Sequence, residues 1–284
     1  MSSSLKTDLF FWLNKYNIKP NKDLGQCFLV DEKALNKIIA AADVHKSDKV
    51  LEVGPGTGIL TEKLLQAGAT VLAVEKDSRL VKILKARFGK EIKRKKLTLL
   101  SSDFLRLNFP DFLKKQRFAA GEYKVVANLP YQITSPVMER LLERSYLPAL
   151  IVLTLQKEVA ERICAKPGNL SSLAVLAQAC ARKCVLVSRF PKSRFYPQPE
   201  VDSALIKLEG LIYPDKIEVK KMRQIIHAGF ARKRKKLKKN LSDAFNKNAV
   251  EKIWKKLDLP ENIRAQELPI EKWVEIANTL SIIF

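Results

Sequence analysis

Short apolar runs alternate with amphipathic segments along residues 31–165, and this alternation restricts the fold more than any other feature of the chain. Strands separated by helices of this length pair in parallel, with the helices covering the faces of the sheet. We therefore expect an α/β fold built on a mostly parallel sheet. The expected strands are 49–53, 70–75, 97–100, 123–127 and 149–155. The expected helices are 31–42, 59–67, 77–89, one that begins at Ser135-Pro136, and 156–164.

Capping residues support these helix boundaries. Asp31, Asp77 and Ser135 stand at expected N-termini, where a short polar side chain accepts hydrogen bonds from free backbone N–H groups. Pro136 follows Ser135, and proline is favoured at the first helical position because its nitrogen has no hydrogen to leave unpaired.

The pattern changes after residue 165. A helix is expected at 173–181, and strands are expected at 183–188 and 203–209. Because no helix separates these two strands, we expect an antiparallel pair that closes one edge of the sheet. Residues 211–215 have the composition of a linker, and 216–284 show helical periodicity with almost no glycine. The expected domains are an α/β domain with an N-terminal helical extension, 1–210, and a small all-helical domain, 211–284.

The charge balance is strongly basic. Lysine and arginine number 52 against 30 aspartates and glutamates, which gives a formal net charge of +22. Such a surface attracts a polyanion, with nucleic acid the first candidate and an anionic membrane surface the second. No apolar run approaches the roughly 20 residues that span a bilayer, and the first residues lack the features of a signal peptide. We therefore expect a cytoplasmic protein that does not enter a membrane.

The cysteines and histidines do not indicate a metal site. The four cysteines form no CxxC pair, and the two histidines lie far from them in the sequence. A zinc site and a disulfide framework are both disfavoured in a chain of this length. We expect the cysteines to serve as small apolar residues of a reduced protein.

A glycine-rich loop, Glu52-Val-Gly54-Pro-Gly56-Thr-Gly58, joins the first expected strand to a helix. Glycine lets the backbone turn tightly and lets a ligand approach it closely. Glu75 ends the next strand, where a carboxylate accepts hydrogen bonds from ribose hydroxyls, and Asp103 follows the third strand. A nicotinamide dinucleotide needs GxGxxG, but Ile59 holds the place of the third glycine. The pattern therefore favours S-adenosylmethionine over a dinucleotide or over a glycine turn without a ligand.

The tetrapeptide Asn128-Leu129-Pro130-Tyr131 follows a buried strand, at the edge of the sheet where ligands bind. The Asn128 amide oxygen and the Leu129 carbonyl are suited to accept hydrogen bonds from the exocyclic amino group of a base. Pro130 stiffens the turn, and Tyr131 is placed to stack on the base. Phe195 is the candidate for the opposite face of the base, although an aromatic residue at a strand edge also serves as a core residue.

The ordered set of motifs resembles the bacterial small-subunit rRNA adenine dimethyltransferases, the KsgA or RsmA family. The resemblance covers nearly the whole chain, so it is more specific than any single motif. The segments that carry it are 24–29, 52–58, 74–77, 103–105, 128–131, 156–160 and 195–203.

By this resemblance the fold is a Rossmann-like S-adenosylmethionine-dependent methyltransferase fold with a small helical C-terminal domain. The implied substrate is a pair of adjacent adenosines, each methylated twice, in a hairpin loop near the 3′ end of small-subunit (16S) rRNA. The implied partner is the 30S ribosomal particle during its biogenesis, and the protein is expected to act as a monomer. The residues implied to hold the cofactor are Gln26, Cys27, Leu29, Gly54, Gly56, Glu75, Asp103 and Asn128.

Cys27 departs from the family pattern, which usually has asparagine or histidine there. We predict that the contact at this position is made by the backbone, so that cysteine serves equally well.

Seven basic residues within eight positions suggest where RNA is held. They lie in the C-terminal region, which a methyltransferase acting on a small molecule does not need, and we expect them to contact phosphates. They are Arg232, Lys233, Arg234, Lys235, Lys236, Lys238 and Lys239. A second basic run, 93–96, is either a further phosphate contact or a solvated face.

Two other functions stay open at this point. The large-subunit rRNA adenine methyltransferases that confer macrolide resistance are related, but they usually have isoleucine where this chain has Leu129. The other alternative is a non-catalytic RNA-binding factor of ribosome assembly that keeps the fold.

Overall fold

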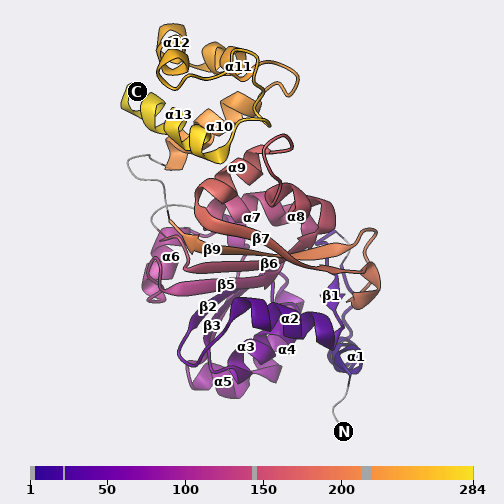
Figure 1. Cartoon of the computed structure of the whole chain (residues 1–284). Helices are drawn as coiled ribbons and strands as arrows, with labels where there is room; N and C mark the ends of the chain where they lie inside the picture. The colour runs from indigo at the N-terminus through magenta and orange to yellow at the C-terminus, as the bar shows by residue number, and fades with distance from the viewer. Residues whose placement is uncertain (1–3, 22, 143–145, 213–218, 284) are drawn as a thin grey trace.

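The computed structural model describes residues 4–21, 23–142, 146–212 and 219–283 (Figure 1). The strands are β1 (Phe28–Leu29), β2 (Lys49–Val53), β3 (Thr70–Glu75), β4 (Leu97–Ser101), β5 (Tyr123–Asn128), β6 (Leu150–Gln156), β7 (Ala181–Phe190), β8 (Phe195–Tyr196) and β9 (Ser203–Leu211). The helices before β7 are α1 (Leu5–Lys15), α2 (Glu32–Ala42), α3 (Ile59–Gln66), α4 (Ser78–Arg87), α5 (Gly89–Lys93), α6 (Phe109–Lys115), α7 (Thr134–Leu141), α8 (Lys157–Ile163) and α9 (Ser172–Ala179). The helices after β9 are α10 (Val219–Phe230), α11 (Leu237–Ala244), α12 (Lys247–Lys256) and α13 (Ile270–Ile283).

Within the described residues, the main sheet has seven strands in the order β4-β3-β2-β5-β6-β9-β7. Strands β2 to β6 are parallel, and β9 runs antiparallel between β6 and β7. The expected fold class and the antiparallel edge are therefore confirmed. The carboxyl ends of β4, β3, β2 and β5 lie side by side in that order, which is the arrangement that creates a binding edge in a parallel sheet.

Two apolar cores cover the two faces of the sheet, because neighbouring residues of a strand point to opposite sides. In β2, Val50 belongs to the core that includes α2, α3 and α4, whereas Leu51 belongs to the core on the other face. The chain between β2 and β6 thus packs as a layer of helices on each face, as crossover helices require.

Several local predictions are confirmed, and two helix boundaries are wrong. Asp31 and Asp77 cap α2 and α4, where each side chain accepts a backbone N–H. Ser135 does not cap a helix: α7 begins one residue earlier, at Thr134, because a 3-10 turn over Tyr131–Ile133 leads directly into it. The expected helix 77–89 ends at Arg87, and the short α5 follows it.

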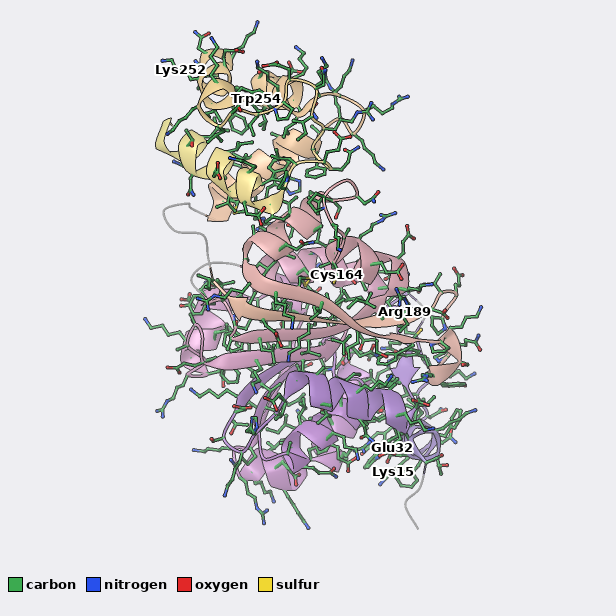
Figure 2. The ribbon with its side chains drawn as sticks, viewed as in Figure 1. Lys15, Glu32, Cys164, Arg189, Lys252 and Trp254 are labelled. Atoms are coloured by element: carbon green, nitrogen blue, oxygen red, sulfur yellow. The ribbon has the colours of Figure 1, made fainter. Side chains whose placement is uncertain are left out.

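Of the C-terminal helices, α10 and α13 pack on α9, and α11 and α12 pack on these two at the top of the view in Figure 1. The core on the α9 side of the sheet continues into them through Met222, Trp254 and Trp273, all of which are buried. Figure 2 labels Trp254 among these helices. Both indole N–H groups donate to backbone carbonyls, so these large side chains are packed without an unpaired donor. The domain boundary at 210/211 stays a prediction. Of the expected linker, Leu211 ends β9, and residues 213–215 lie outside the described residues.

The helices within the described residues are too short or too polar to span a membrane. No cluster of three histidine, cysteine, aspartate or glutamate side chains in the same segments is arranged to hold a metal ion.

Candidate active site

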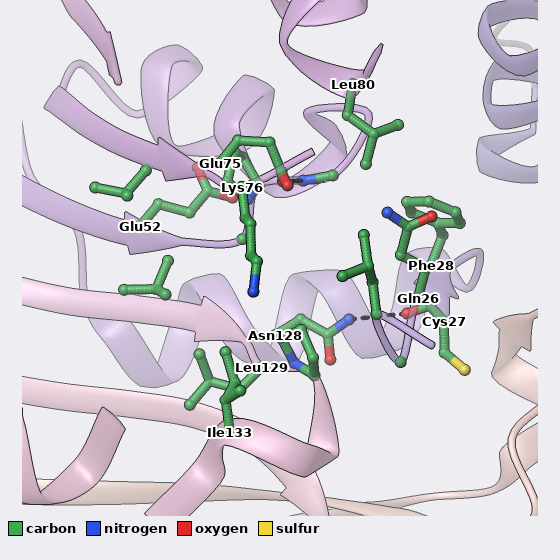
Figure 3. Close-up of a pocket in the computed structure, with 18 of the residues that line it drawn as sticks. Gln26, Cys27, Phe28, Glu52, Glu75, Lys76, Leu80, Asn128, Leu129 and Ile133 are labelled. Carbon is green, nitrogen blue, oxygen red and sulfur yellow. Dashed lines mark hydrogen bonds between the residues drawn. The ribbon is translucent and has the colours of Figure 1, made fainter. Parts of the chain in front are cut away.

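A cavity lies at the carboxyl edge of the parallel strands, between the glycine loop, the segment around β1 and the turn after β5 (Figure 3). The structure brings together eleven of the predicted catalytic and cofactor-binding residues in its lining. These are Gln26, Cys27, Leu29, Gly54, Gly56, Glu75, Asp103, Asn128, Leu129, Pro130 and Tyr131.

The three loop glycines have positive φ angles but different surroundings. A Cβ atom on Gly58 would lie 2.4 Å from the ring of Phe88, so this glycine is required by packing. At Gly56 the Phe28 ring would be 3.0 Å away, whereas at Gly54 the nearest atom is Cδ of Pro130, at 3.7 Å. The backbone at Gly54 is therefore the part of the loop that a ligand in the cavity approaches most freely.

Glu75 lies at the end of β3 and is buried, with only 6% of the residue exposed. Its two oxygens accept hydrogen bonds from the backbone N–H groups of Gly56 and Asp77, at 3.1 and 2.8 Å. Burial raises its pKa to about 7, against the lowering effect of these two bonds. Each oxygen keeps a further lone pair, so the group remains able to accept from ligand hydroxyls.

Glu52 is a second buried acid behind the glycine loop. It is 1% exposed, and the Thr61 hydroxyl donates a hydrogen bond of 2.7 Å to it. Burial raises the pKa of Glu52 to about 8, and the nearby charge of Glu75 adds to the rise. Glu52 is therefore mostly a neutral acid at pH 7. The sequence pattern did not identify Glu52 as a buried acid with a raised pKa, because Glu52 belongs to the strand that precedes the loop.

The segment before β1 is held to the end of β3 by a long-range hydrogen bond. Gln26 Nε2 donates to Asp77 Oδ2 at 2.9 Å, and its Oε1 accepts from the backbone N–H of Asn21 at 2.8 Å. Asp77 was predicted only as a helix cap. Asp77 also accepts the hydrogen bond from Gln26, which lies 51 positions earlier in the chain. No local sequence pattern predicts a contact over that distance.

Asp103 lies at the end of β4, on the same edge of the cavity. Its Oδ2 is 3.0 Å from Lys76 Nζ, and its Oδ1 accepts the backbone N–H of Leu105 at 3.0 Å. Lys76 is mostly exposed, with 60% of its side chain accessible. The carboxylate is therefore fixed by the backbone, and its cationic partners, Lys76 and, at 4.0 Å, Arg106, are exposed side chains.

Asn128 is oriented by the segment that carries Cys27. Its Nδ2 donates to the Cys27 carbonyl oxygen at 3.3 Å, a bond drawn in Figure 3. Because the amide nitrogen is used in this way, the amide oxygen is left as the acceptor at the cavity.

Pro130 lies between the segment before β1 and the glycine loop. A Cβ atom added to Gly25 would be 3.5 Å from the Pro130 ring, and one added to Gly54 would be 3.7 Å from it.

The hydroxyl group of Tyr131 is hydrogen-bonded to a buried side chain. Its hydroxyl lies 2.7 Å from Oγ of Ser203, which is fully buried at the start of β9. Burial raises the pKa of Tyr131 above its usual value, so the hydroxyl stays neutral and hydrogen-bonded. Ser203 was predicted only as the first residue of a strand, and its contact with Tyr131 is revealed by the fold.

The structure does not bring Phe195 into the cavity lining. It is 4% exposed, pairs with Leu29 in the small β1–β8 sheet and packs in the core on the α2 side. This is the core position that the sequence left open as an alternative, and a stacking role for Phe195 stays a prediction.

The predicted RNA-binding cluster separates into two groups. Lys238 is 2.9 Å from Glu251 and 2.7 Å from Glu261, and its side chain is only 17% exposed. Lys239 and Arg232 both pair with Asp243. The other four, in the turn between α10 and α11, are exposed and form no ion pair with any described residue. They are Lys233, Arg234, Lys235 and Lys236.

The chain is similar in sequence to known proteins over almost its whole length. The family model described as ribosomal RNA adenine dimethylase matches residues 17–281. The ribosomal RNA small subunit methyltransferase A of Nostoc sp. is 37% identical, over 93% of this chain and 99% of its own. The protein of the same name from Lactobacillus helveticus is 36% identical, over 99% of this chain and 97% of its own.

Solved structures agree with this result. A dimethyladenosine transferase from Plasmodium falciparum superposes with a TM-score of 0.71 at 27% identity, over 88% of this chain and 95% of its own. The 23S rRNA methyltransferase ErmE shares the fold, with a TM-score of 0.67 at 23% identity over 89% of this chain and 99% of its own. The family match covers nearly the whole chain and includes every segment that lines the cavity, so the chain belongs to the ribosomal RNA adenine dimethylase family.

Proposed function

We propose that the protein transfers methyl groups from S-adenosylmethionine to the exocyclic amino groups of two adjacent adenosines in small-subunit rRNA, each methylated twice. The observation that carries the proposal is the orientation of Asn128. Its amide nitrogen is bound by the Cys27 carbonyl, so its oxygen faces the cavity between the glycine loop and Tyr131. A hydrogen-bond acceptor at this junction suits a reaction in which a base must be held against a methyl donor.

The cavity has the donor and acceptor groups that S-adenosylmethionine requires. Glu75 offers a buried carboxylate for ribose hydroxyls, and the positive φ of Gly54 leaves open backbone beside it. Asp103, whose Oδ1 accepts the Leu105 N–H, would receive the adenine amino group, and the chain at Gln26 and Cys27 lines the remaining side. When bound, this cofactor supplies an electrophilic methyl group on a sulfonium sulfur.

The protein's contribution to the chemistry is positioning and electrostatics. An adenine amino group is a poor nucleophile because its lone pair is delocalised into the ring. Asn128 Oδ1 and the Leu129 carbonyl oxygen accept its two hydrogens, which favours the pyramidal nitrogen needed for attack. Tyr131 stacks on the base, which contributes roughly 1–3 kcal/mol. The methylated nitrogen then loses its proton to water, so the site needs no strong base.

The small ribosomal subunit is favoured over the large one by the relatives. Those matched at 36–37% identity over almost the whole chain are named for the small subunit, whereas ErmE, at 23% identity, supports the fold alone. Intact Glu75, Asp103, Asn128 and Tyr131 also favour a catalyst over a binding factor that has lost its activity.

The test uses cells with and without the gene. Both ribosomal subunits from cells without the gene are incubated with the purified protein and tritiated S-adenosylmethionine, and the RNA is analysed by mass spectrometry. We expect two methyl groups on each of two adjacent adenosines in the small subunit only. Asn128→Ala protein is the control for contaminating activity. Incorporation into the large subunit alone, or into neither, would refute the proposal.

We further propose that the free cations of the turn between α10 and α11 contact RNA phosphates. Each phosphate contact contributes about 0.7–0.9 to the slope of log binding constant against log salt concentration. Replacing Lys235 and Lys236 with glutamine should therefore lower the slope by roughly one to two units. Lys238→Gln is the matched control, because that side chain already pairs with two glutamates, and it should leave the slope unchanged. Equal slopes in all three proteins would remove the turn from the interface.

A further inference from the structure

Helix α1 precedes the residues that the family model matches, yet a buried side chain connects it to the candidate active site. That side chain belongs to Arg87, the last residue of α4, and it is only 7% exposed. One terminal nitrogen of its guanidinium lies 2.6 Å from Asp8 of α1, and the other lies 2.7 Å from Glu62 of α3. The rings of Trp12 and Phe88 lie next to the guanidinium, with their centres 5.8 and 5.4 Å from its carbon. Because the guanidinium is planar and its N–H groups point in fixed directions, these contacts fix α1 relative to α3 and α4.

Arg87 also contacts the glycine loop. The nitrogen that meets Asp8 donates to the backbone carbonyl oxygen of Thr57 at 3.3 Å. The next residue of the loop is Gly58, and the ring of Phe88 fills the space where a Cβ atom on Gly58 would lie. Two successive residues at the end of α4 therefore hold two successive residues of the loop.

The same part of the loop lines the cavity. Gly56 and Thr57 are both in the lining, and the Gly56 N–H donates to Glu75, the carboxylate proposed to bind ribose. A displacement of Thr57 therefore moves the neighbouring Gly56 N–H and alters the support of Glu75. No described residue of α1 lines the cavity, so α1 can affect a ligand there only through contacts such as these.

A second contact joins α1 to another wall of the cavity. The ring of Phe10 packs edge-on against Tyr196 of β8, with the ring centres 4.7 Å apart. Tyr196 pairs with Phe28 of β1, and Phe28 lines the cavity. Figure 1 shows α1 directly below β1. Helix α1 thus supports the glycine loop through Arg87 and the β1 segment through Phe10.

We propose that Arg87 is a positioning residue for cofactor binding, which couples α1 to the glycine loop so that docked α1 strengthens the binding of S-adenosylmethionine. The inference rests on the proposed function, because it assumes that cofactor. Arg87 is not among the described residues that line the cavity, and it acts through Thr57. Coupling of this kind is reciprocal. The bound cofactor must therefore hold α1 in place more firmly, by the same factor by which α1 strengthens cofactor binding.

The first test measures affinity for S-adenosylhomocysteine by calorimetric titration, at a temperature where all the proteins are folded. We expect Arg87→Met to weaken binding by roughly tenfold, which is within the range typical of coupled sites. Lys124→Met is the matched control. Lys124 is 18% exposed and pairs with Asp48 at 2.8 Å, and it lies near the amino end of β5, at the edge of the sheet away from the cavity. This variant should lose thermal stability, as Arg87→Met does, but keep the affinity of the unmodified protein.

Hydrogen exchange separates positioning from a merely structural role. In the unmodified protein, saturating S-adenosylhomocysteine should slow the exchange of the α1 backbone amides, relative to those of α12, by about the factor of affinity that Arg87→Met loses. In Arg87→Met the ligand should no longer slow the exchange of α1. A side chain that only stabilises the fold would not make the exchange of α1 depend on the ligand.

The variant Asp8→Asn tests the same coupling if Arg87→Met does not fold. It removes the charge on α1 and leaves Arg87 paired with Glu62, and it should lower the affinity by about fivefold.

Two results would overturn the inference. One is an affinity in the Arg87 and Asp8 variants equal to that of Lys124→Met, and the other is exchange of α1 that the ligand leaves unchanged in the unmodified protein. Failure of the proposed function gives a different result, because the unmodified protein would then not bind S-adenosylhomocysteine at all.

Discussion

The two ends of the cavity are held in different ways. At the glycine-loop end, Glu75 accepts backbone N–H groups that are 19 and 2 residues away in the sequence, and Glu52 binds a threonine 9 residues away. At the other end, Asn128 is oriented by a carbonyl 101 residues away, and the Tyr131 hydroxyl meets a serine 72 residues away. The two buried carboxylates beside the glycine loop are thus held by contacts within 19 residues, whereas Asn128 and Tyr131 are held only when distant segments have assembled.

This difference suggests separate roles for the two ends. Under the proposed function, the buried carboxylates serve binding, because the ligand groups they would meet do not change during the reaction. The Asn128 amide oxygen would serve the transition state, in which the amino group becomes more acidic and its hydrogen bonds strengthen. Changes at the two ends should therefore affect different measured quantities.

The largest effect is expected for Asn128→Ala. Loss of one oriented hydrogen-bonding group that acts in a transition state typically lowers kcat by about 10²–10³. We expect that loss here, with an affinity for S-adenosylhomocysteine that changes less than the rate does. Single-turnover methyl transfer and calorimetric titration measure the two quantities. Equal losses of affinity and rate would show that Asn128 serves mainly the cofactor, and the separation of the two ends would fail.

The next effect is expected for Glu75→Gln, in cofactor affinity. Hydrogen bonds to a charged group contribute about 1.5–3 kcal/mol, so the affinity should fall by roughly ten- to a hundredfold. The rate at saturating cofactor should change much less.

The pH dependence of binding gives a sharper form of this test. Burial raises the pKa of Glu75 to about 7 in the free protein, and ribose hydroxyls that donate to it favour its charged form. Binding therefore lowers that pKa and releases a proton. The affinity of the unmodified protein should fall as pH drops below about 7 and should level off above it. Glu75→Gln should lack this slope, and a slope retained in the variant would assign it to another group.

The two ends also differ in how far they can be predicted from sequence. The strands, the glycine loop and Glu75 follow from periodicity and spacing, because residues near in sequence make these structures. The Cys27–Asn128 and Tyr131–Ser203 contacts do not, because a residue pattern does not show which segments pack together. Phe195 marks the same limit: its motif identifies it as important, but whether it faces the cavity or the core depends on the β1–β8 pairing.

A smaller effect, on stability, is expected for Glu52→Gln. The pKa of Glu52 is about 8 in the folded protein and near 4.5 when unfolded, so the folded state holds its proton more tightly. The stability contributed by this proton is complete below pH 4.5 and is lost as pH rises through 8. Glutamine at position 52 has no proton to lose in this pH range. Its Tm relative to the unmodified protein should therefore rise by several degrees between pH 5 and pH 8.5, since each pKa unit corresponds to about 1.4 kcal/mol.

Calorimetry of both proteins across this pH range measures the difference. The difference in Tm cancels the effect of burying Glu75, which is common to both proteins, and keeps only its charge interaction with Glu52. A constant difference would mean that Glu52 is already ionised at neutral pH, and the buried acid would then add a negative charge behind the glycine loop.

The smallest effect is expected for Cys27→Ser. This variant tests whether the backbone or the side chain of residue 27 orients Asn128. The Cys27 group that contacts Asn128 is the backbone carbonyl oxygen, which serine also provides. The thiol is half-buried, and burial raises its pKa above the usual value, so it carries no charge that serine would remove. Cofactor affinity and kcat should both stay within about threefold, which corresponds to less than 1 kcal/mol. A loss above tenfold in either would show that the side chain itself holds the segment over the cavity, and the backbone bond to Asn128 would not be sufficient to orient the amide.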